Sequence, residues 1–563
     1  MKKIVIVGGV AGGATAAARI RRLDEQARIV VFERSGYISY ANCGLPYYIG
    51  GIIEDPEDLT LQTPESFWKR FRVAMKVRHE VTAIHRDRKT VSVKNLDTGE
   101  EFEEDYDKLI LSPGAKPVRP DLPGVDLPQI FTLRTVEDTF RLKEFVEEHH
   151  PRSAVMVGGG FIGVEVAENL RHLGLEVTMV QRPKQLMNPF DADMASFIHS
   201  EMRKHGVKLA LGASVVGFEE KDGGMDVLVK DGAPIHADLV VLAIGVAPES
   251  ALAKDAGLVL GTKGSILVND RMETSDPDIY AVGDAVQVKH FVTGESALIS
   301  LAGPANKQGR IAADNICGGD SRYRGSQGSS VVKIFDITAA STGLNELNAK
   351  KAGLDADAVI LSPMSHAGYY PGGKVMTMKV VFEKETFRLM GAQIVGYDGV
   401  DKRIDVLATA IRYGMRADEL KDLDLAYAPP YSSAKDPVNM AGFIIDNIAH
   451  GFKQWRLEEE KGLPRDGSVI LLDTRTPGEF RRGHVEGFRN IPVDELRERL
   501  GELERGKKVY VICQSGLRSY IAARILEGHG FEVYNFAGGF RFYDAVMNDR
   551  ALIEAALPCG MDR

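Results

Sequence analysis

Residues 3–23 read KIVIVGGVAGGATAAARIRRL, an apolar run that leads into a glycine-rich turn and then into a helix-forming segment. This order of strand, turn and helix lets backbone N–H groups at the helix N-terminus approach a pyrophosphate. The next apolar run, residues 29–32, ends at Glu33, and an acid at that place in such a unit hydrogen-bonds a ribose. Val10 stands where GxGxxG has its second glycine, so this turn alone leaves a role in packing open. We interpret residues 3–33 as the start of a dinucleotide-binding domain.

A second copy of this pattern begins at residue 154 and is complete. The strand-like run AVMV is followed by Gly158, Gly160 and Gly163 in the GxGxxG spacing, and then by a helix-forming segment. Two such units in one chain predict two bound dinucleotides. The next predicted strand ends in Gln181 instead of an acid, which weakens the usual argument for an unphosphorylated ribose. The sequence therefore leaves NADH and NADPH both open.

Composition sets the class of protein. The chain has 563 residues, enough for about three to four domains, with 44% hydrophobic residues, 26% charged residues and a formal net charge of -9. An acidic chain is a poor general binder of nucleic acid or anionic membranes, and no apolar run approaches the length of a membrane span. The four cysteines are too few and too scattered for a disulfide scaffold or a Cys-rich metal site. We therefore expect a cytoplasmic protein that acts on small molecules, without a metal, nucleic-acid or membrane partner.

One cysteine lies in an unusual setting. Residues 39–51 read SYANCGLPYYIGG and follow the second predicted strand, at the edge of the sheet where cofactors bind in such folds. Cys43 lies among small, polar and turn-forming residues, whereas a structural cysteine usually has apolar neighbours. Arg19 and Arg22 lie on one face of the helix after the first glycine turn. They form either a solvated surface or a site for an anionic substrate that extends toward the thiol.

Several motifs together resemble the pyridine nucleotide–disulfide oxidoreductases. They are the two glycine turns at residues 8–13 and 158–163, Glu33, the strand and turn at residues 243–248, and the segment YAVGD at residues 280–284. The resemblance implies FAD in the first dinucleotide-binding domain and NADH or NADPH in the second, with Asp284 on the flavin ribityl chain. Within the family, residues 39–47 and Val10 resemble the coenzyme A-disulfide reductases.

The single cysteine of residues 39–51 has a mechanistic consequence. Members of the wider family with a CxxxxC motif form an internal disulfide, but here Cys43 is alone, so its oxidised partner must come from elsewhere. The resemblance implies a bound coenzyme A joined to Cys43 as a mixed disulfide. The residues expected to hold coenzyme A are Thr15, Arg19, Arg22, Ser39, Asn42 and Asn306. The residues expected to bind the two dinucleotides are Gly8, Val10, Ala11, Gly13, Glu33, Arg34, Ser112, Gly114, Gly158, Gly160, Phe161, Ile162, Gly163, Gln181, Gly245, Gly283, Asp284 and Ala302.

The C-terminal region resembles a single rhodanese domain in four blocks, at residues 469–480, 483–487, 490–492 and 509–519. A predicted strand ends at Cys513, Gly516 permits a tight curl, and a helix starts near Ser519. Backbone N–H groups then converge on the sulfur and, with Arg518, favour a thiolate or a persulfide anion. The predicted sulfur-transfer loop consists of Cys513, Gln514, Ser515, Gly516, Leu517 and Arg518. The alternative is an inactive, rhodanese-like recognition module.

The predicted fold class is α/β, with two Rossmann-like dinucleotide-binding domains, an α+β dimerisation domain and a C-terminal α/β rhodanese domain. The expected boundaries are residues 1–112 and 270–322 for the FAD-binding domain, 113–269 for the NAD(P)H-binding domain, 323–447 for the dimerisation domain, 448–467 for a linker, and 468–563 for the rhodanese domain. The resemblance implies a homodimer in which tyrosines reach across to the active site. We assign this role to Tyr369 and Tyr427, and packing in turns is the alternative.

Together these observations predict an FAD-dependent NAD(P)H reductase of coenzyme A persulfide, coenzyme A disulfide or polysulfide. In this scheme Cys513 delivers sulfane sulfur, and Cys43 attacks the resulting persulfide or disulfide and releases sulfide or thiol. Two alternatives stay open. An NADH oxidase or peroxidase would cycle Cys43 through a sulfenic acid, but it would not need the rhodanese domain. A persulfide carrier or redox sensor would bind FAD without fast turnover. Cys317 and Cys559 have no assigned role.

Overall fold

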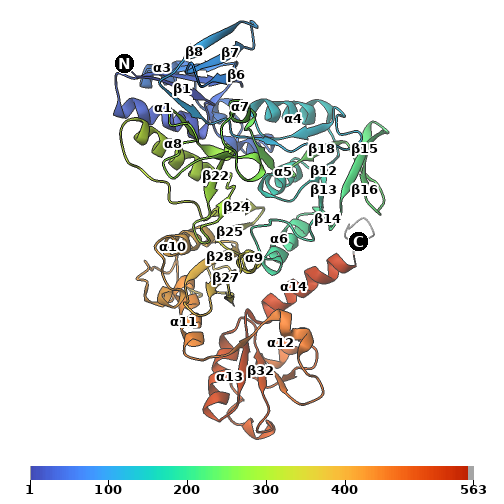
Figure 1. The fold of residues 1–563 in the computed structure, drawn as a ribbon. Helices are drawn as coiled ribbons and strands as arrows, with labels where there is room; N and C mark the ends of the chain where they lie inside the picture. The colour runs from blue at the N-terminus through green and yellow to red at the C-terminus, as the bar shows by residue number, and fades with distance from the viewer. Residues whose placement is uncertain (1, 556–563) are drawn as a thin grey trace. The chain divides into compact units, whose positions relative to one another are not determined.

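The computed structural model describes residues 2–555, and its sheets confirm the predicted fold class. The chain forms two compact units, residues 2–184 with 206–328 and residues 185–205 with 329–555. The first unit carries both dinucleotide-binding sheets, and the second carries the dimerisation-domain sheet and the rhodanese sheet. Helices and strands are labelled as in Figure 1. None of the helices in the described part of the chain has the length and apolar character that crossing a membrane requires.

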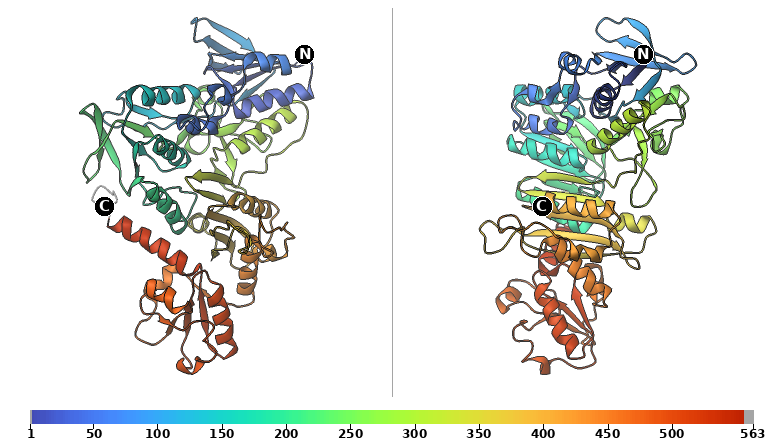
Figure 2. Two further views of the ribbon diagram at one scale, coloured as in Figure 1. Left: turned by 180° about the vertical axis from the view of Figure 1, so that it is seen from behind. Right: turned by 90° about the vertical axis from the view of Figure 1, so that its left-hand side faces the viewer.

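The first unit begins with a parallel five-stranded sheet in the order β21-β9-β1-β2-β5. Its strands are β1 (Lys3–Val7), β2 (Arg28–Glu33), β5 (Ala74–Val77), β9 (Lys108–Leu111) and β21 (Ile279–Ala281). Its helices are α1 (Ala11–Leu23), α3 (Pro64–Phe71) and α8 (Ala302–Ile316). The central strand β1 is apolar on both faces, and Ile4, Val5 and Ile6 are fully buried, as a central parallel strand requires. Helices α1 and α8 lie side by side in Figures 1 and 2.

Shorter elements surround this sheet. An antiparallel sheet consists of β6 (His79–His85), β7 (Thr90–Asn95) and β8 (Glu101–Asp105), and residues 96–100 join the last two strands. The remaining elements are β3 (Ile38–Tyr40), η1 (Asn42–Gly44), α2 (Leu45–Ile49), η2 (Pro56–Leu59), β4 (Thr60–Gln62), β20 (Ile266–Leu267), η4 (Gly283–Ala285), β22 (Val286–Lys289) and β23 (Ser296–Ala297). They place the cysteine segment, residues 39–51, next to the edge at which β1 ends.

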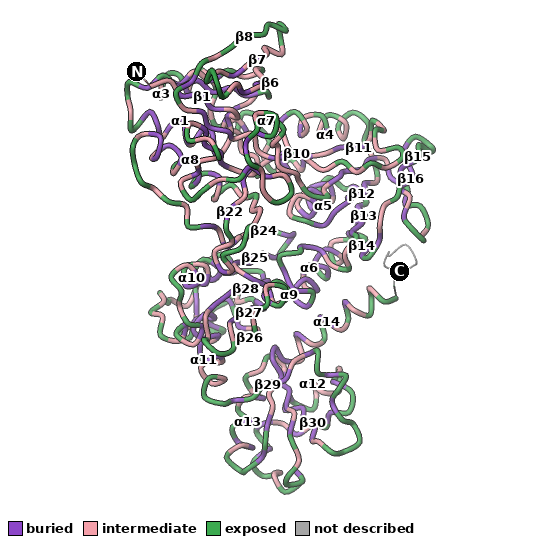
Figure 3. Tube along the Cα trace, viewed as in Figure 1, coloured by how far each residue is buried: buried purple, intermediate pink, exposed green. Residues whose placement is uncertain are grey.

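The second parallel sheet has the order β11-β18-β12-β13-β14. Its strands are β11 (Ile130–Thr132), β12 (Ser153–Val157), β13 (Glu176–Gln181), β14 (Lys208–Leu211) and β18 (Leu239–Leu242), with helices α4 (Val136–His149) and α5 (Phe161–His172) nearby. Helix α7 (Ala251–Asp255) packs instead against β6 and the core around the first sheet. Antiparallel strands β15 (Val215–Lys221), β16 (Gly224–Val229) and β17 (Ile235–Ala237), the pair β10 (Ala115–Pro117) and β19 (Val246–Pro248), and η3 (Thr262–Gly264) complete the unit. The traces of β12 and β13 are mostly buried in Figure 3, because these strands lie inside the sheet.

The second unit contains an antiparallel sheet in the order β24-β25-β28-β27-β26. Its strands are β24 (Ser330–Ile334), β25 (Ile337–Gly343), β26 (Ala356–Leu361), β27 (Met376–Glu383) and β28 (Leu389–Gly396). The accompanying helices are α6 (Ala192–Lys204), α9 (Glu346–Lys351), α10 (Val400–Arg412), η5 (Ala417–Asp422) and α11 (Pro437–Ala449). Lys379 of β27 is buried and pairs with Asp193 at 2.8 Å and Asp191 at 3.1 Å. Because an unpaired buried charge is costly, these contacts fix α6 and its preceding segment against the sheet.

The rhodanese sheet is parallel, in the order β29-β33-β32-β30-β31. Its strands are β29 (Gln454–Trp455), β30 (Ile470–Asp473), β31 (Arg489–Asn490), β32 (Val509–Ile512) and β33 (Val533–Phe536), with η6 (Leu457–Gly462), α12 (Pro477–Arg482), η7 (Leu500–Glu502), α13 (Leu517–Gly528) and α14 (Gly539–Glu554). Strand β29 falls within residues 448–467, the predicted linker. Trp455 is fully buried there, and its Nε1–H donates to the carbonyl oxygen of Val511 at 3.2 Å. Part of the predicted linker therefore belongs to the rhodanese sheet.

Candidate active site

The first glycine turn closes tightly around its own backbone. A Cβ on Gly13 would lie 1.9 Å from the carbonyl oxygen of Gly8, so a larger residue does not fit there. The N–H of Gly9 donates to Glu33 Oε2 and the N–H of Ser35 donates to Glu33 Oε1, both at 2.8 Å. Glu33 therefore fixes this turn from the end of β2. Its predicted contact with a ribose stays a prediction.

The second glycine turn repeats this arrangement with a neutral side chain. The N–H of Gly159 donates to Gln181 Oε1 at 3.0 Å, the counterpart of the bond to the carboxylate in the first turn. A Cβ on Gly163 would lie 2.1 Å from the carbonyl oxygen of Gly158, whereas a Cβ on Gly160 would meet no atom within 4 Å. Gly160 thus presents an open face at the start of α5, where the backbone of such a unit approaches a pyrophosphate. Gln181 adds no negative charge, so NADH and NADPH both stay open.

The helices behind both turns begin without a side-chain cap. Helix α1 follows Val10 and α5 follows Gly160, and neither residue has a side chain that accepts a helix N–H. By contrast, α3 and α4 begin with capping boxes. Uncapped N–H groups at a helix N-terminus are free to bind phosphate, so both turns fit a dinucleotide. Of the other predicted cofactor residues, Ala11, Phe161, Ile162 and Ala302 lie at helix starts, and Arg34, Ser112, Gly114, Gly245 and Gly283 lie just after strands.

Asp284 has a basic partner that the sequence analysis missed. Arg134 Nη2 lies 2.7 Å from Asp284 Oδ2, and the N–H of Gly283 donates to Gln308 Oε1 at 2.7 Å. Arg134 lies in the connection between β11 and α4, outside every quoted motif. Its position beside Asp284 depends on the packing of segments about 150 residues apart in the chain. The predicted contact of Asp284 with a flavin ribityl chain stays a prediction.

The cysteine segment is anchored to the first glycine turn. The N–H of Ser39 donates to the carbonyl oxygen of Gly9 at 2.9 Å, and Ser39 has a left-handed conformation with φ of 44°. Asn42 begins η1, and Cys43 follows it. The structure thus brings the predicted reactive cysteine next to the first dinucleotide turn.

The electrostatic surroundings of Cys43 oppose its ionisation. Cys43 is exposed as a residue, but protein atoms around its thiol partly exclude water, and this desolvation raises the pKa of the thiol. The carboxylates of Glu165 and Asp284 raise the pKa of Cys43 further, whereas Arg134 lowers it. The thiolate is the nucleophilic form of cysteine. Among the described residues that act on the thiol, Arg134 is therefore the one that favours the reactive form.

Glu165 is a second residue near the thiol that sequence reasoning missed. It lies on α5, and the hydroxyl of Tyr47 donates to its Oε1 at 3.3 Å. Burial raises the pKa of Glu165 to about 7, and the neighbouring Glu168 acts in the same direction. Within the sequence GVEVAENL this glutamate is an ordinary polar residue of a helix, so only the fold reveals its burial beside the cysteine segment.

The residues expected to hold coenzyme A are partly brought together between α1 and α8. The hydroxyl of Thr15 donates to Asn306 Oδ1 across these helices. Arg19 Nε donates to Asp314 Oδ1 at 2.7 Å, so this guanidinium already has an acidic partner. Arg22 is exposed on the same helix. The assignment of these residues to coenzyme A stays a prediction.

Cys513 lies at the end of β32 and is fully buried. The N–H of Gly516 donates to Cys513 Sγ at 3.1 Å, and the hydroxyl of Ser519 donates to it at 3.3 Å. Gly516 has a φ of +97° and forms the N-cap of α13, so the loop curls around the sulfur as the sequence predicted. Gln514, Ser515, Leu517 and Arg518 complete this loop. Donors on the sulfur stabilise a thiolate or a persulfide anion.

Arg518 is held by an acid from α12. Its two terminal nitrogens contact the two oxygens of Glu479 at 2.8 and 2.7 Å, a bidentate ion pair. This pair is the main reason that the pKa of Glu479 is lowered to about 2. Glu479 also caps α12 through Thr476, which matches the S/T-x-x-E spacing of a capping box. The sequence pattern therefore signalled the cap, but not the contact with Arg518.

Tyr369 and Tyr427 are brought together in the second unit. Their hydroxyl oxygens are 2.6 Å apart, and both side chains are exposed. Their predicted role at an active site across a dimer stays a prediction. Of the two unassigned cysteines, Cys317 packs against the core of the first unit, and burial raises the pKa of its thiol. Cys559 lies outside the described residues.

Comparison with known proteins identifies the parts of the chain. Residues 2–309 match the family described as pyridine nucleotide-disulphide oxidoreductase, residues 329–437 match the dimerisation domain of that family, and residues 457–545 match the rhodanese-like domain. The first match covers more than half of the chain. The chain belongs to the pyridine nucleotide-disulphide oxidoreductase family. This family is FAD-dependent and uses NAD(P)H, so the chain is an oxidoreductase with a fused rhodanese-like domain.

Several relatives in this family are similar over most of the chain. A coenzyme A disulfide reductase of Staphylococcus aureus (strain bovine RF122 / ET3-1) is 39% identical over 444 residues, which cover 79% of this chain and 99% of the relative. The reduced CoADR-RHD of Bacillus anthracis is 49% identical, with a TM-score of 0.95 over 98% of this chain and 99% of that structure. An NAD-dependent persulfide reductase from A. fulgidus is 39% identical, with a TM-score of 0.90 over 96% of this chain and 100% of that structure.

Proposed function

We propose that the chain reduces coenzyme A persulfide, coenzyme A disulfide or polysulfide with electrons from NAD(P)H, and that its rhodanese-like domain supplies sulfane sulfur. The observation that carries this proposal is the setting of Cys43, which lies alone beside a dinucleotide turn. The other cysteines within residues 2–555 are Cys317, in the core of the first unit, and Cys513, in the second unit. Residues 39–51 hold no second cysteine, so in this proposal an oxidised Cys43 pairs with a thiol from a substrate. The names of the relatives support the same substrate class.

The proposed reaction begins at the Cys43 sulfur. Its thiolate attacks the sulfur of coenzyme A persulfide that is bonded to the coenzyme A carbon. The sulfur–sulfur bond of the persulfide breaks, hydrosulfide leaves and takes up a proton, and a mixed disulfide joins Cys43 to coenzyme A. FAD held at the first glycine turn, near Gly9 and Glu33, would supply the two electrons from NAD(P)H that convert this disulfide into Cys43 thiolate and coenzyme A thiol.

Protonation of Glu165 tunes the first step. With a pKa of about 7, this carboxyl exchanges its proton near neutral pH, and its negative charge raises the pKa of Cys43 when the proton is absent. A protonated Glu165 therefore favours the thiolate, and the positive charge of Arg134 acts in the same direction. Arg134 in turn is positioned by Asp284.

The rhodanese-like domain provides the second half of the proposed reaction. The Cys513 sulfur, with donors from Gly516 and Ser519, holds a sulfane sulfur as a persulfide anion and passes it to a thiol acceptor such as coenzyme A. The dimerisation domain supports a homodimer, in which Tyr369 or Tyr427 donates a hydrogen bond to a leaving thiolate.

A substrate comparison under anaerobic conditions tests this function. Purified holoenzyme is supplied with NADH or NADPH and with coenzyme A disulfide, coenzyme A persulfide or polysulfide, and cofactor oxidation and sulfide release are measured. We expect rapid oxidation with at least one of these substrates, and sulfide in proportion to the persulfide or polysulfide consumed. Oxidation that requires oxygen or peroxide would favour the oxidase alternative, and the similarity to a water-forming NADH oxidase from Lactobacillus brevis makes this control necessary. Bound FAD without oxidation of NADH or NADPH by any of these substrates would favour the alternative of a persulfide carrier or redox sensor.

A further inference from the structure

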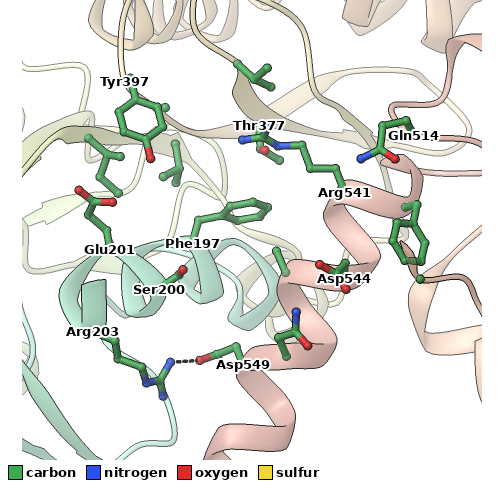
Figure 4. Close-up of a pocket in the computed structure, with 18 of the residues that line it drawn as sticks. Phe197, Ser200, Glu201, Arg203, Thr377, Tyr397, Gln514, Arg541, Asp544 and Asp549 are labelled. Atoms are coloured by element: carbon green, nitrogen blue, oxygen red, sulfur yellow. Dashed lines mark hydrogen bonds and ion pairs between the residues drawn. The ribbon is translucent and has the colours of Figure 1, made fainter. Parts of the chain in front are cut away.

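The second unit contains a cavity of about 890 Å³ that borders the rhodanese loop. It lies between α6, the dimerisation-domain sheet, the rhodanese loop and α14, as Figure 4 shows. Aromatic side chains of Phe197, Tyr397 and Phe540 line it together with charged side chains. Its volume is in the range of sites for organic ligands and greatly exceeds the need of a small inorganic anion.

One partly buried cation of this cavity lacks a counter-ion among the described residues. The guanidinium of Arg541 extends from α14 toward Thr377 of β27 (Figure 4). Its Nε is buried without a hydrogen-bond partner, and its side chain forms no ion pair within residues 2–555. Burial lowers the pKa of Arg541, and the lone opposing influence comes from Tyr397. Because an unpaired and partly buried cation is costly, an anionic ligand is the group that stabilises this arrangement.

Most other charges of the cavity already have partners. Arg203 pairs with Asp549 at 2.6 Å, and Arg475 pairs with Asp473 at 2.7 Å. Glu479, the acid that holds the rhodanese loop, is likewise paired.

The three remaining charges fall into two groups. Glu201 contacts Lys204 and His205, so it is compensated. Arg482 and Asp544 are exposed and lack ion pairs in the described part of the chain, so water solvates both. The partly buried cation on α14 is therefore the charge that distinguishes this cavity from an ordinary surface hollow.

The cavity borders the rhodanese loop. Gln514, next to Cys513, lines it. The N–H of Phe540 donates to the carbonyl oxygen of Cys513 at 2.7 Å, and the N–H of Arg541 donates to that of Gln514 at 3.1 Å. An anion bound to Arg541 is thus held at the edge of the loop that surrounds the sulfur.

We propose that this cavity binds the sulfur donor of Cys513, an organic persulfide whose thiol carrier bears a carboxylate or phosphate group that pairs with Arg541. The inference rests on the proposed function of the rhodanese-like domain. The Cys513 thiolate attacks the terminal sulfur of the donor, a sulfur–sulfur bond to Cys513 forms, and the donor bond breaks. The carrier leaves as a thiolate that takes up a proton, so the transfer needs no external oxidant or reductant. Because Cys513 is buried, the loop moves during transfer.

Sulfur loading of full-length protein without NAD(P)H tests this site. The donors are glutathione persulfide, its diethyl ester, coenzyme A persulfide and thiosulfate, and peptide mass spectrometry follows the gain of sulfur on Cys513. In Arg541→Gln we expect kcat/KM for an acidic donor to fall at least about tenfold, because KM rises. The diethyl ester lacks the free carboxylates, so its kcat/KM should fall by less. Arg541→Lys should recover part of the loss. Arg550→Gln, on the same helix but outside the cavity lining, should load at the wild-type rate.

The donors separate the outcomes. If kcat/KM of Arg541→Gln falls only for glutathione persulfide, the carrier that pairs with Arg541 bears a carboxylate. If it falls only for coenzyme A persulfide, the carrier bears a phosphate. The proposal is overturned if kcat/KM of Arg541→Gln falls equally for glutathione persulfide and its diethyl ester. It is also overturned if kcat/KM is unchanged for both glutathione persulfide and coenzyme A persulfide. Loading by thiosulfate alone also overturns it. If wild-type protein loads Cys513 but does not reduce persulfides with NAD(P)H, the proposed reductase function is refuted. The comparison of donors still tests the donor site in that case, because loading is measured without NAD(P)H.

Discussion

Replacement of Gly160 by alanine separates the fold of the second glycine turn from its binding of NAD(P)H. A Cβ at this position meets no atom within 4 Å, and the residue has φ of -85° and ψ of -170°, an extended conformation open to alanine. We therefore expect the free energy of unfolding to change by less than about 1 kcal/mol. The same methyl group would stand between the start of α5 and a bound pyrophosphate.

The expected loss of binding follows from the contact that this methyl group blocks. A hydrogen bond from a helix N-terminal N–H to a charged phosphate contributes about 1.5 to 3 kcal/mol. Loss of one such bond weakens binding by roughly tenfold to a hundredfold. Titration of the holoenzyme with NAD⁺ and NADP⁺ measures the dissociation constants without turnover, and thermal unfolding measures stability in the same samples.

Gly163→Ala is the matched control, because its Cβ would lie 2.1 Å from the carbonyl oxygen of Gly158. The free energy of unfolding should fall several times more in Gly163→Ala than in Gly160→Ala, since the backbone must move to admit the methyl group. Wild-type affinity for both nucleotides in a normally folded Gly160→Ala protein would refute the reasoning, because no pyrophosphate would then approach this turn.

Other predictions concern the titrating groups. Glu165 has a raised pKa of about 7, so its contribution to stability falls as pH rises through about 4.5 to 7; Glu165→Gln should raise the unfolding midpoint at pH 8.5 and leave it nearly unchanged at pH 4.5. Arg134→Gln should slow alkylation of Cys43 at pH 7.5 by a few-fold, because it removes the group that lowers the thiol pKa, and an unchanged rate profile would contradict this. Glu479→Gln should reduce sulfur loading of Cys513 by about tenfold or more while Cys43 alkylation stays normal, because Arg518 loses its bidentate partner; equal effects at both cysteines would argue for general damage.

Local patterns were sufficient for the parts of the fold that local chemistry determines. Strand, glycine turn and helix in residues 3–23 and 154–173 predicted both dinucleotide units, because a close approach such as that of Gly13 to Gly8 requires glycine. The departure at Val10 did not prevent this, since α1 still begins without a side-chain cap. The curl at Gly516 was likewise readable from the sequence.

Contacts between segments that are distant in the chain could not be predicted from the sequence. Arg134 and Glu165 act on Cys43 from other elements of the first unit, and neither lies in a motif whose spacing indicates that contact. The predicted linker at residues 448–467 is rich in charge, which concealed strand β29 and the buried Trp455. Arg541 reads as one more basic residue of a helix, and only tertiary packing gives it a desolvated position without a counter-ion.

The most direct test of Cys43 as the redox centre compares Cys43→Ser with Cys513→Ser in the anaerobic NAD(P)H assay. Both full-length variants are supplied with coenzyme A persulfide, and sulfide release is measured beside wild type. We predict that Cys43→Ser abolishes sulfide release, whereas Cys513→Ser keeps it with this free persulfide and loses only the use of donors that load the rhodanese loop. Full sulfide release by Cys43→Ser would show that this cysteine is not the reducing centre.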